Sequence, residues 1–225
     1  VDYICTSEME AATAQEGPEP EAKERKPKEK IAGSYLALGG GVAGDVFASI
    51  KGFDKLTWSA RFAGYKVVKQ WVHVGGFLAY TGVKGKDSET VIGIQALHDV
   101  ALGLALNFGG QIGSKVFMGF GLDVGLSAIR VTPVESGDRE EISSKVLPMV
   151  YLDLMLHTMF MVGKLPNGKG VGIDLCVTTP VLMGNIDYEY DYSSSSTWIH
   201  STMNTLALWS GIGFLVSVVF GVGKG

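Results

Sequence analysis

Residues Lys115–Val131 alternate between an apolar face of seven consecutive positions and a face whose middle positions are small or polar. The even positions form an apolar face that runs from Val116 to Ala128, whereas the odd positions between Phe117 and Ile129 are glycine, serine or, at their middle, Asp123. A period of two indicates a β-strand, and this one is far longer than the usual ~5–6 residues. The chain must therefore place a long apolar sheet face against either a protein core or lipid.

The same alternation recurs along the chain, and eight segments are predicted as strands. Most of them exceed the ~9–11 residues that a tilted strand needs to cross a bilayer. The connections between them alternate between short and long, which is typical of outer-membrane barrels. The segments are Gly33–Ala48, Leu56–Lys66, Gln70–Thr81, Thr90–Phe108, Lys115–Val131, Lys145–Gly163, Val171–Gly184 and Thr205–Gly221.

Glycine is unusually frequent, at 31 of 225 residues, about twice the usual ~7%. Many of these glycines lie inside the alternating segments, where glycine weakens a strand unless tight curvature or close approach requires it. A small, strongly curved barrel supplies that requirement on its inner wall. We therefore predict an all-β fold, an eight-stranded antiparallel transmembrane β-barrel that occupies Ile31–Gly225.

The segment Val1–Lys30 differs in composition from the rest. It holds 13 of the 42 charged residues of the chain, so it cannot bury enough apolar surface to offset the entropy of ordering. We predict a disordered polar tail or linker. Because an even number of strands returns the chain to its starting end, this tail is expected in the periplasm with the short turns.

Several function classes find little support. The net charge of −4 and the lack of a basic stripe argue against nucleic-acid binding. Cys5 and Cys176 lie far apart, and no Cys/His cluster has metal-ligand spacing, so no metal, cofactor or disulfide is expected. Gly39–Gly44 matches a dinucleotide-binding pattern, but further alternation follows it where a helix is required. His200 and Ser201 suggest hydrolysis by residue type alone, and no enzyme activity is expected.

The expected inward face carries isolated charged side chains, which are costly to bury unless paired or hydrated. Two interpretations stay open: a polar plug, in which the arginine and histidines satisfy the aspartates, or a narrow wet path whose excess of acids favours cations. If Asp123 and Asp153 face each other on neighbouring strands, they require a shared proton or a cation. The candidate residues are Asp45, Arg61, His73, Asp123, Asp153, His157 and Asp174.

The longest predicted loop, Asn185–Asn204, is rich in aromatic residues. These residues are expected either to join the aromatic girdle at the membrane interface or to form a contact surface, since Tyr and Trp dominate binding hot spots. The loop candidates are Tyr188, Tyr190, Tyr192 and Trp198, and aromatic belts could also include Trp58, Trp71, Tyr80, Tyr151 and Trp209.

Two other folds compete with the membrane barrel. The uncharged segment Leu206–Gly223 is long enough for a single transmembrane helix, although it is rich in glycine and alternates. A soluble lipocalin-like barrel would keep eight strands but turn the apolar faces inward, and the opposite faces here carry too few charges for a soluble exterior.

Segments such as VFMGFGLDVGLSAI and LALWSGIGFLVSVVF give the chain a pattern that resembles the small eight-stranded outer-membrane proteins of the OmpX, OmpW and OmpA-barrel type. The resemblance covers about Gly33–Gly221 and implies a bacterial outer-membrane location, with the lipid bilayer as partner. Resemblance to OmpW implies a narrow passage for small solutes, either small hydrophobic molecules or cations. Resemblance to OmpX implies a surface-exposed structural or adhesion protein with a closed barrel, which binds host or matrix proteins through its long loops.

Overall fold

The computed structural model describes residues 33–44, 56–84, 94–112, 115–133, 146–165, 169–194 and 197–222. Within these residues the chain forms strands joined by turns. The strands are β1 (Ser34–Gly44), β2 (Leu56–Lys69), β3 (Val72–Lys84), β4 (Ile94–Ile112), β5 (Val116–Pro133), β6 (Val146–Lys164), β7 (Gly170–Ser194), β8 (Thr197–Ser210) and β9 (Ile212–Gly221). The predicted tail Val1–Lys30 lies outside the described residues and stays a prediction.

The strands close into a ring of eight. Each strand from β1 to β7 pairs antiparallel with the next, and β9 pairs with both β7 and β1. Only Gly211 separates β8 from β9 in the chain, so these two form one interrupted strand. The closing seam between β1 and β9 runs from Tyr35 opposite Gly221 to Gly44 opposite Ile212. The prediction of an all-β, eight-stranded antiparallel barrel is confirmed.

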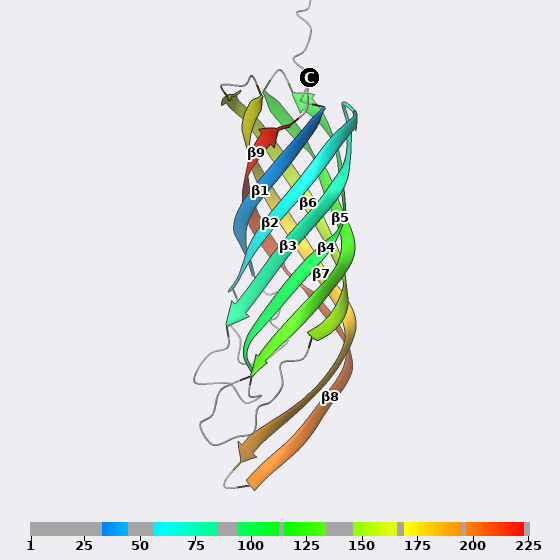
Figure 1. Ribbon diagram of the computed structural model, residues 1–225, viewed down its shortest axis with the longest axis vertical. Coiled ribbons are helices and arrows are strands. Elements are labelled where there is room, and N and C mark those ends of the chain that lie inside the picture. Colours follow the sequence, from blue (N-terminus) through cyan, green and yellow to red (C-terminus); the bar gives the residue numbers. More distant parts are fainter. Residues whose placement is uncertain are drawn as a thin grey trace, which may run out of the picture.

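The two ends of the barrel differ (Figure 1). The short turn Gln70–Trp71 joins β2 to β3 at the same end as the start of β1 and the end of β9. The chain crosses from β1 to β2, from β3 to β4 and from β5 to β6 at the opposite end, through longer connections. Antiparallel strands with alternating connection lengths thus give a short-turn end and a long-connection end.

The prediction that Asn185–Asn204 is a loop is wrong for most of its length. Strand β7 continues to Ser194 and pairs with β8 from Val181 opposite Ser210 to Ser194 opposite Thr197. Pairing of β7 with β6 ends at Met183, so the remaining residues form a two-stranded hairpin arm, which extends beyond the barrel (Figure 1). The segment was predicted as a loop because its composition is polar, whereas its backbone is paired between β7 and β8.

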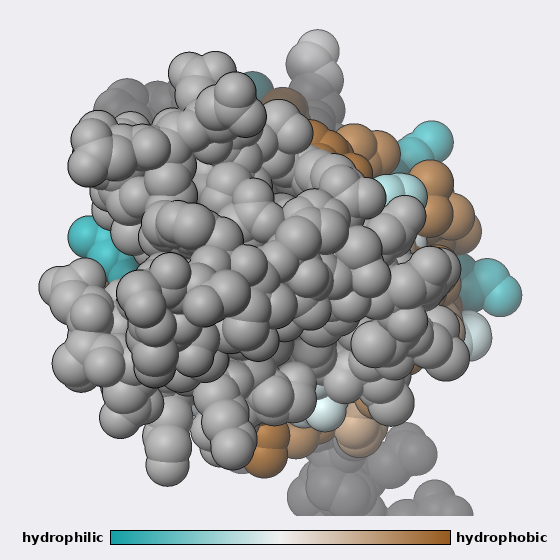
Figure 2. All heavy atoms as spheres, turned by 90° about the horizontal axis from the view of Figure 1, so that it is seen from below, coloured by the Kyte–Doolittle hydropathy of each residue, from teal (hydrophilic) through white to brown (hydrophobic). Residues whose placement is uncertain are grey.

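Alternate side chains separate the interior from the exterior. Positions such as Asp123 and Ala101 on the inner wall have no exposed surface, whereas Leu126 and Leu104 on the outer wall are 68% and 66% exposed. Figure 2 shows the molecule from the long-connection end. Hydrophobic residues, coloured brown, lie at the periphery of this view, on the outside of the barrel. The outward apolar face contradicts the soluble lipocalin-like alternative, because water would face leucine, valine and phenylalanine.

The single-helix alternative is also excluded for the segment that suggested it, since Leu206–Gly221 lies in β8 and β9 apart from Gly211. Among the described residues, no helix has the length and apolarity needed to span a membrane.

Gly75 lies on the inner wall, close to the backbone of the neighbouring strand β2. A Cβ atom added there would overlap the backbone carbonyl of Gly64 on β2, which cannot move without breaking the β2–β3 pairing. We expect Gly75→Ala to lower the free energy of unfolding by about 1–3 kcal/mol. Equilibrium urea unfolding in lipid vesicles measures this value. Gly110→Ala is the matched control, because nothing lies within 4 Å of its added Cβ, and equal losses from both changes would contradict the close approach.

Candidate functional site

The centre of the barrel holds an ion pair that crosses its bore. Arg61 on β2 donates from Nε to Oδ2 of Asp123 on β5 at 2.7 Å, and from Nη2 to Oδ1 at 2.9 Å. Strands β3 and β4 separate β2 from β5 in the ring, so the guanidinium spans the interior. Both side chains are almost completely buried, at 6% and 0% exposure. This bidentate geometry is the strong form of a charge-assisted contact.

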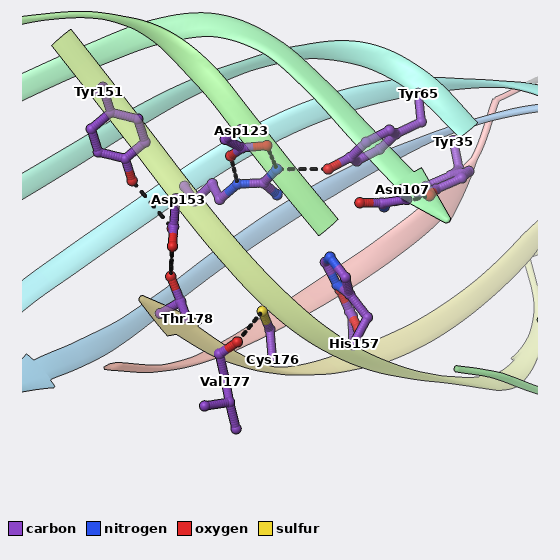
Figure 3. Close-up of polar contacts among 12 residues, drawn as sticks. Tyr35, Tyr65, Asn107, Asp123, Tyr151, Asp153, His157, Cys176, Val177 and Thr178 are labelled. Carbon is purple, nitrogen blue, oxygen red and sulfur yellow. Dashed lines mark hydrogen bonds and ion pairs between the residues drawn. The ribbon is translucent and has the colours of Figure 1, made fainter. Parts of the chain in front are cut away.

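Two stacked tyrosines extend this ion pair toward the short-turn end. Arg61 also donates from Nη2 to the Tyr65 hydroxyl at 2.6 Å. The Tyr65 ring stacks on Tyr35 with centroids 4.9 Å apart. The guanidinium thus has both a carboxylate and a phenol oxygen as acceptors, which fixes its position (Figure 3).

Asp153 lies opposite Asp123 in the β5–β6 register, as the sequence hypothesis assumed. The two carboxylates nevertheless have separate partners. Thr178 Oγ1 donates to both oxygens of Asp153, at 2.5 Å to Oδ1, and the Tyr151 hydroxyl donates to Oδ2 at 3.3 Å. Of the two acids, Arg61 donates only to Asp123, so each acid has its own hydrogen-bond donors (Figure 3).

A contact between a histidine and an aspartate joins β6 to β7. Nδ1 of His157 lies 2.9 Å from Oδ2 of Asp174. Nε2 of His157 has no hydrogen-bond partner among the described residues and lies against Gly121, where a Cβ atom would overlap it. Oδ1 of Asn107 lies 2.9 Å from the same Cβ position. The glycine therefore makes room for an imidazole edge and an amide oxygen.

His73 takes part in a hydrogen-bonded group at the short-turn end. Nδ2 of Asn107 donates to the Tyr35 hydroxyl at 3.2 Å, and that hydroxyl lies 2.9 Å from Nδ1 of His73. The Tyr35 oxygen accepts the hydrogen bond from Asn107, so the Tyr35 hydroxyl can donate its own hydrogen bond to Nδ1 of His73. The ring of His73 stacks on Phe117, with centroids 4.8 Å apart.

Asp99 is an inward acid that the sequence selection left out. It is 1% exposed, and neither carboxylate oxygen has a well-aligned hydrogen bond among the described residues. The hydroxyl of Ser127, on the neighbouring strand β5, is also unpaired within the described part of the chain. Alternation alone placed Asp99 on the inner face, so the same signal that selected Asp123 could have selected it.

Apolar side chains fill the bore on both sides of the polar centre. Toward the long-connection end the buried residues include Val83, Leu97, Ile129 and Leu147. Toward the short-turn end they include Phe117, Met159 and Val219. The interior is a packed core with a charged middle layer.

The structure places most of the sequence candidates in one interior. The six described members are all buried: Arg61, His73, Asp123, Asp153, His157 and Asp174. Asp45 lies outside the described residues. The side chains of Tyr188, Tyr190, Tyr192, Trp198 and Trp209 also lie outside what is described, although their backbones pair in the β7–β8 hairpin.

The aromatic belt prediction fails for Tyr151, which is 3% exposed and faces the interior, where its hydroxyl contacts Asp153. Trp58 and Trp71 are outward and about half exposed, at 49% and 55%. Cys176 is a free, buried cysteine. Among the described residues, no group of three or more His, Cys, Asp or Glu side chains is arranged to hold a metal ion.

Comparison with protein-family models finds no match, and no curated protein matches the chain. A similar solved structure is that of the outer membrane protein AlkL, determined by solid-state NMR in DMPC lipid bilayers. The sequence identity is 14%, the TM-score is 0.34, and the alignment covers 89% of this chain and 96% of AlkL.

Proposed function

We propose that this chain is a bacterial outer-membrane protein whose closed barrel anchors a surface-exposed binding arm, the β7–β8 hairpin. The observation that carries this proposal is the Arg61–Asp123 ion pair, which crosses the bore at its centre and from which we infer that the bore is closed. A barrel with a closed bore can bind partners only on its outer wall or at its two ends, and the β7–β8 hairpin extends from one of these ends.

The outer wall supports the membrane location. Leu102, Leu104, Phe120 and Leu126 are each more than 60% exposed and lie on the neighbouring strands β4 and β5. A soluble monomer rarely exposes a contiguous apolar patch of more than a few hundred Å². Because lipid is as apolar as these side chains, a bilayer removes the free-energy cost of exposing them to water. The long connections at one end of the barrel are also typical of outer-membrane barrels.

The hairpin arm is suited to contact. From Gly184 to Ser194, β7 pairs with β8 alone, a length of roughly 35 Å at about 3.3 Å per residue. Tyr188, Tyr190 and Tyr192 occupy alternate positions opposite Met203, Ser201 and Ile199. These three tyrosine positions therefore share one face of the ribbon, and tyrosine is enriched in binding hot spots.

Adhesion of bacteria that display the protein, measured on immobilised fibronectin and laminin, tests the proposed binding. We expect Tyr188→Ser/Tyr190→Ser/Tyr192→Ser to reduce adhesion more than tenfold, since each hot-spot residue contributes about 2 kcal/mol or more. The matched control is Asp187→Ser/Glu189→Ser/Asp191→Ser, which changes the alternate positions and should retain adhesion within about threefold. A heat-modifiability gel checks that each barrel has folded. Equal adhesion by all three proteins contradicts the binding arm.

A narrow passage for small solutes or cations is the second candidate. It is favoured by the buried polar atoms that have no partner among the described residues, at His73, Asn107, His157, Asp174 and Asp99. Such a passage requires Arg61 to leave Asp123. Conductance of the wild-type protein across a planar bilayer supports this candidate and contradicts the closed barrel.

A further inference from the structure

The short-turn end of the barrel is basic. The stretches 66–72, 108–118 and 160–171, which contain the three short turns, carry five lysines and no Asp or Glu. The long connections at the other end, residues 45–55, 85–93 and 134–145, carry eight acidic and five basic residues. The two ends of the barrel therefore differ in the sign of their charge.

Four of these lysines, Lys66, Lys69, Lys115 and Lys164, are exposed, and we call the first three the basic rim. Lys164 and Lys169 lie at the third short turn of the same end. Lys66 and Lys69 lie at the end of β2 and Lys115 lies just before β5, so the rim covers the part of the barrel from β2 to β5.

The backbone of the rim is held in place. The Trp71 carbonyl accepts a hydrogen bond from Gly109 N at 3.0 Å, and the Lys115 carbonyl accepts one from Met161 N at 2.7 Å. These bonds tie each short turn to the neighbouring strand. The ammonium of Lys69 lies 5.6 Å from the centre of the Trp71 ring, a cation–π distance.

The rim lies where the apolar outer wall ends. Val68, Ile112 and Val162, all at the short-turn end, are each at least 59% exposed. Lysine stems cover such apolar surface while the ammonium reaches toward polar headgroups, and tryptophan prefers this depth of a membrane. The rim therefore combines the charge and the depth suited to the headgroup layer.

We propose that the basic rim binds the phosphates of anionic phospholipid headgroups in the leaflet at the short-turn end. This inference rests on the proposed membrane location. Separate lysines on two successive short turns match separate, singly charged headgroups, and each lysine near an anionic surface is worth about a fivefold preference. The rival occupant is the acidic segment Asp2–Glu21 of the same chain, which has six acidic and no basic residues.

The test uses the full chain refolded in vesicles of equal phosphatidylglycerol and phosphatidylcholine. Native mass spectrometry after gentle detergent extraction counts the lipids that remain bound. We expect phosphatidylglycerol to be retained several-fold over phosphatidylcholine, and Lys66→Gln/Lys69→Gln/Lys115→Gln to remove most of that preference. Lys84→Gln/Arg130→Gln, which removes two exposed basic residues near the long-connection end, should keep the preference.

Salt gives an independent test on the wild-type protein. Because exposed charges are screened within about 3 Å at 1 M ionic strength, the preference for phosphatidylglycerol should fall toward the bulk ratio as salt rises. Equal retention of both lipids at low salt overturns the proposal, as does a preference that the triple variant keeps. A heat-modifiability gel separates these results from failure of the membrane location, since a protein that folds without detergent or lipid contradicts the latter.

Discussion

Arg61→Met is expected to lower the free energy of unfolding by about 3–5 kcal/mol, the usual cost of removing one partner from a buried ion pair. Asp123 is 0% exposed and takes both of its hydrogen bonds from this guanidinium. Methionine fills most of the space but leaves the buried carboxylate without its hydrogen-bond donors. Equilibrium urea unfolding in lipid vesicles, followed by tryptophan fluorescence, measures the change.

Two further variants separate the ion pair from a general effect of losing an arginine. Arg130→Met removes an exposed arginine near the end of β5 and should change the free energy of unfolding by no more than about 1 kcal/mol. The double variant Arg61→Met/Asp123→Leu removes both charges and should recover much of the loss, because apolar replacements of a buried pair are often neutral. A double variant as unstable as the single one would show that the carboxylate is not the source of the cost.

Leu104→Arg is expected to lower the free energy of unfolding in lipid by about 2–4 kcal/mol, the cost of a cation on the lipid face near the bilayer midplane. Leu104 is 66% exposed and lies near the middle of β4, so the packing inside the barrel does not change. The expected cost therefore comes from placing the arginine charge in the hydrocarbon layer. The same unfolding measurement in vesicles gives the value.

Val68→Arg is the matched control for the lipid face. Val68 is also strongly exposed, at 59%, but lies one residue from the end of β2. An arginine there can reach the headgroup layer, so the expected cost is about 0–1 kcal/mol. Equal and small effects at Leu104 and Val68 would mean that the outer wall does not face lipid, and the proposed membrane location would then fail.

The alternation of side chains made the barrel predictable. Alternation assigns neighbouring residues such as Val124 and Asp123 to opposite faces of a strand. A slip of one residue in the pairing would turn the inward charged side chains toward lipid, so the pattern favours a single register. The even strand number followed from the same pattern. Composition misled the prediction at Tyr188 and its neighbours, because a polar, aromatic segment has the same local character whether it is a loop or a paired hairpin.

The sequence by itself determined which face of the barrel each residue occupies, since a strand has a period of two and this is a local property. Only the tertiary structure decided which inward residues meet. Arg61 and Asp123 are 62 positions apart in the chain, and Tyr151 contacts Asp153 although it was expected in a belt. These contacts depend on the stagger between strands and on the curvature that carries a side chain across the bore, and both are fixed only when the ring closes.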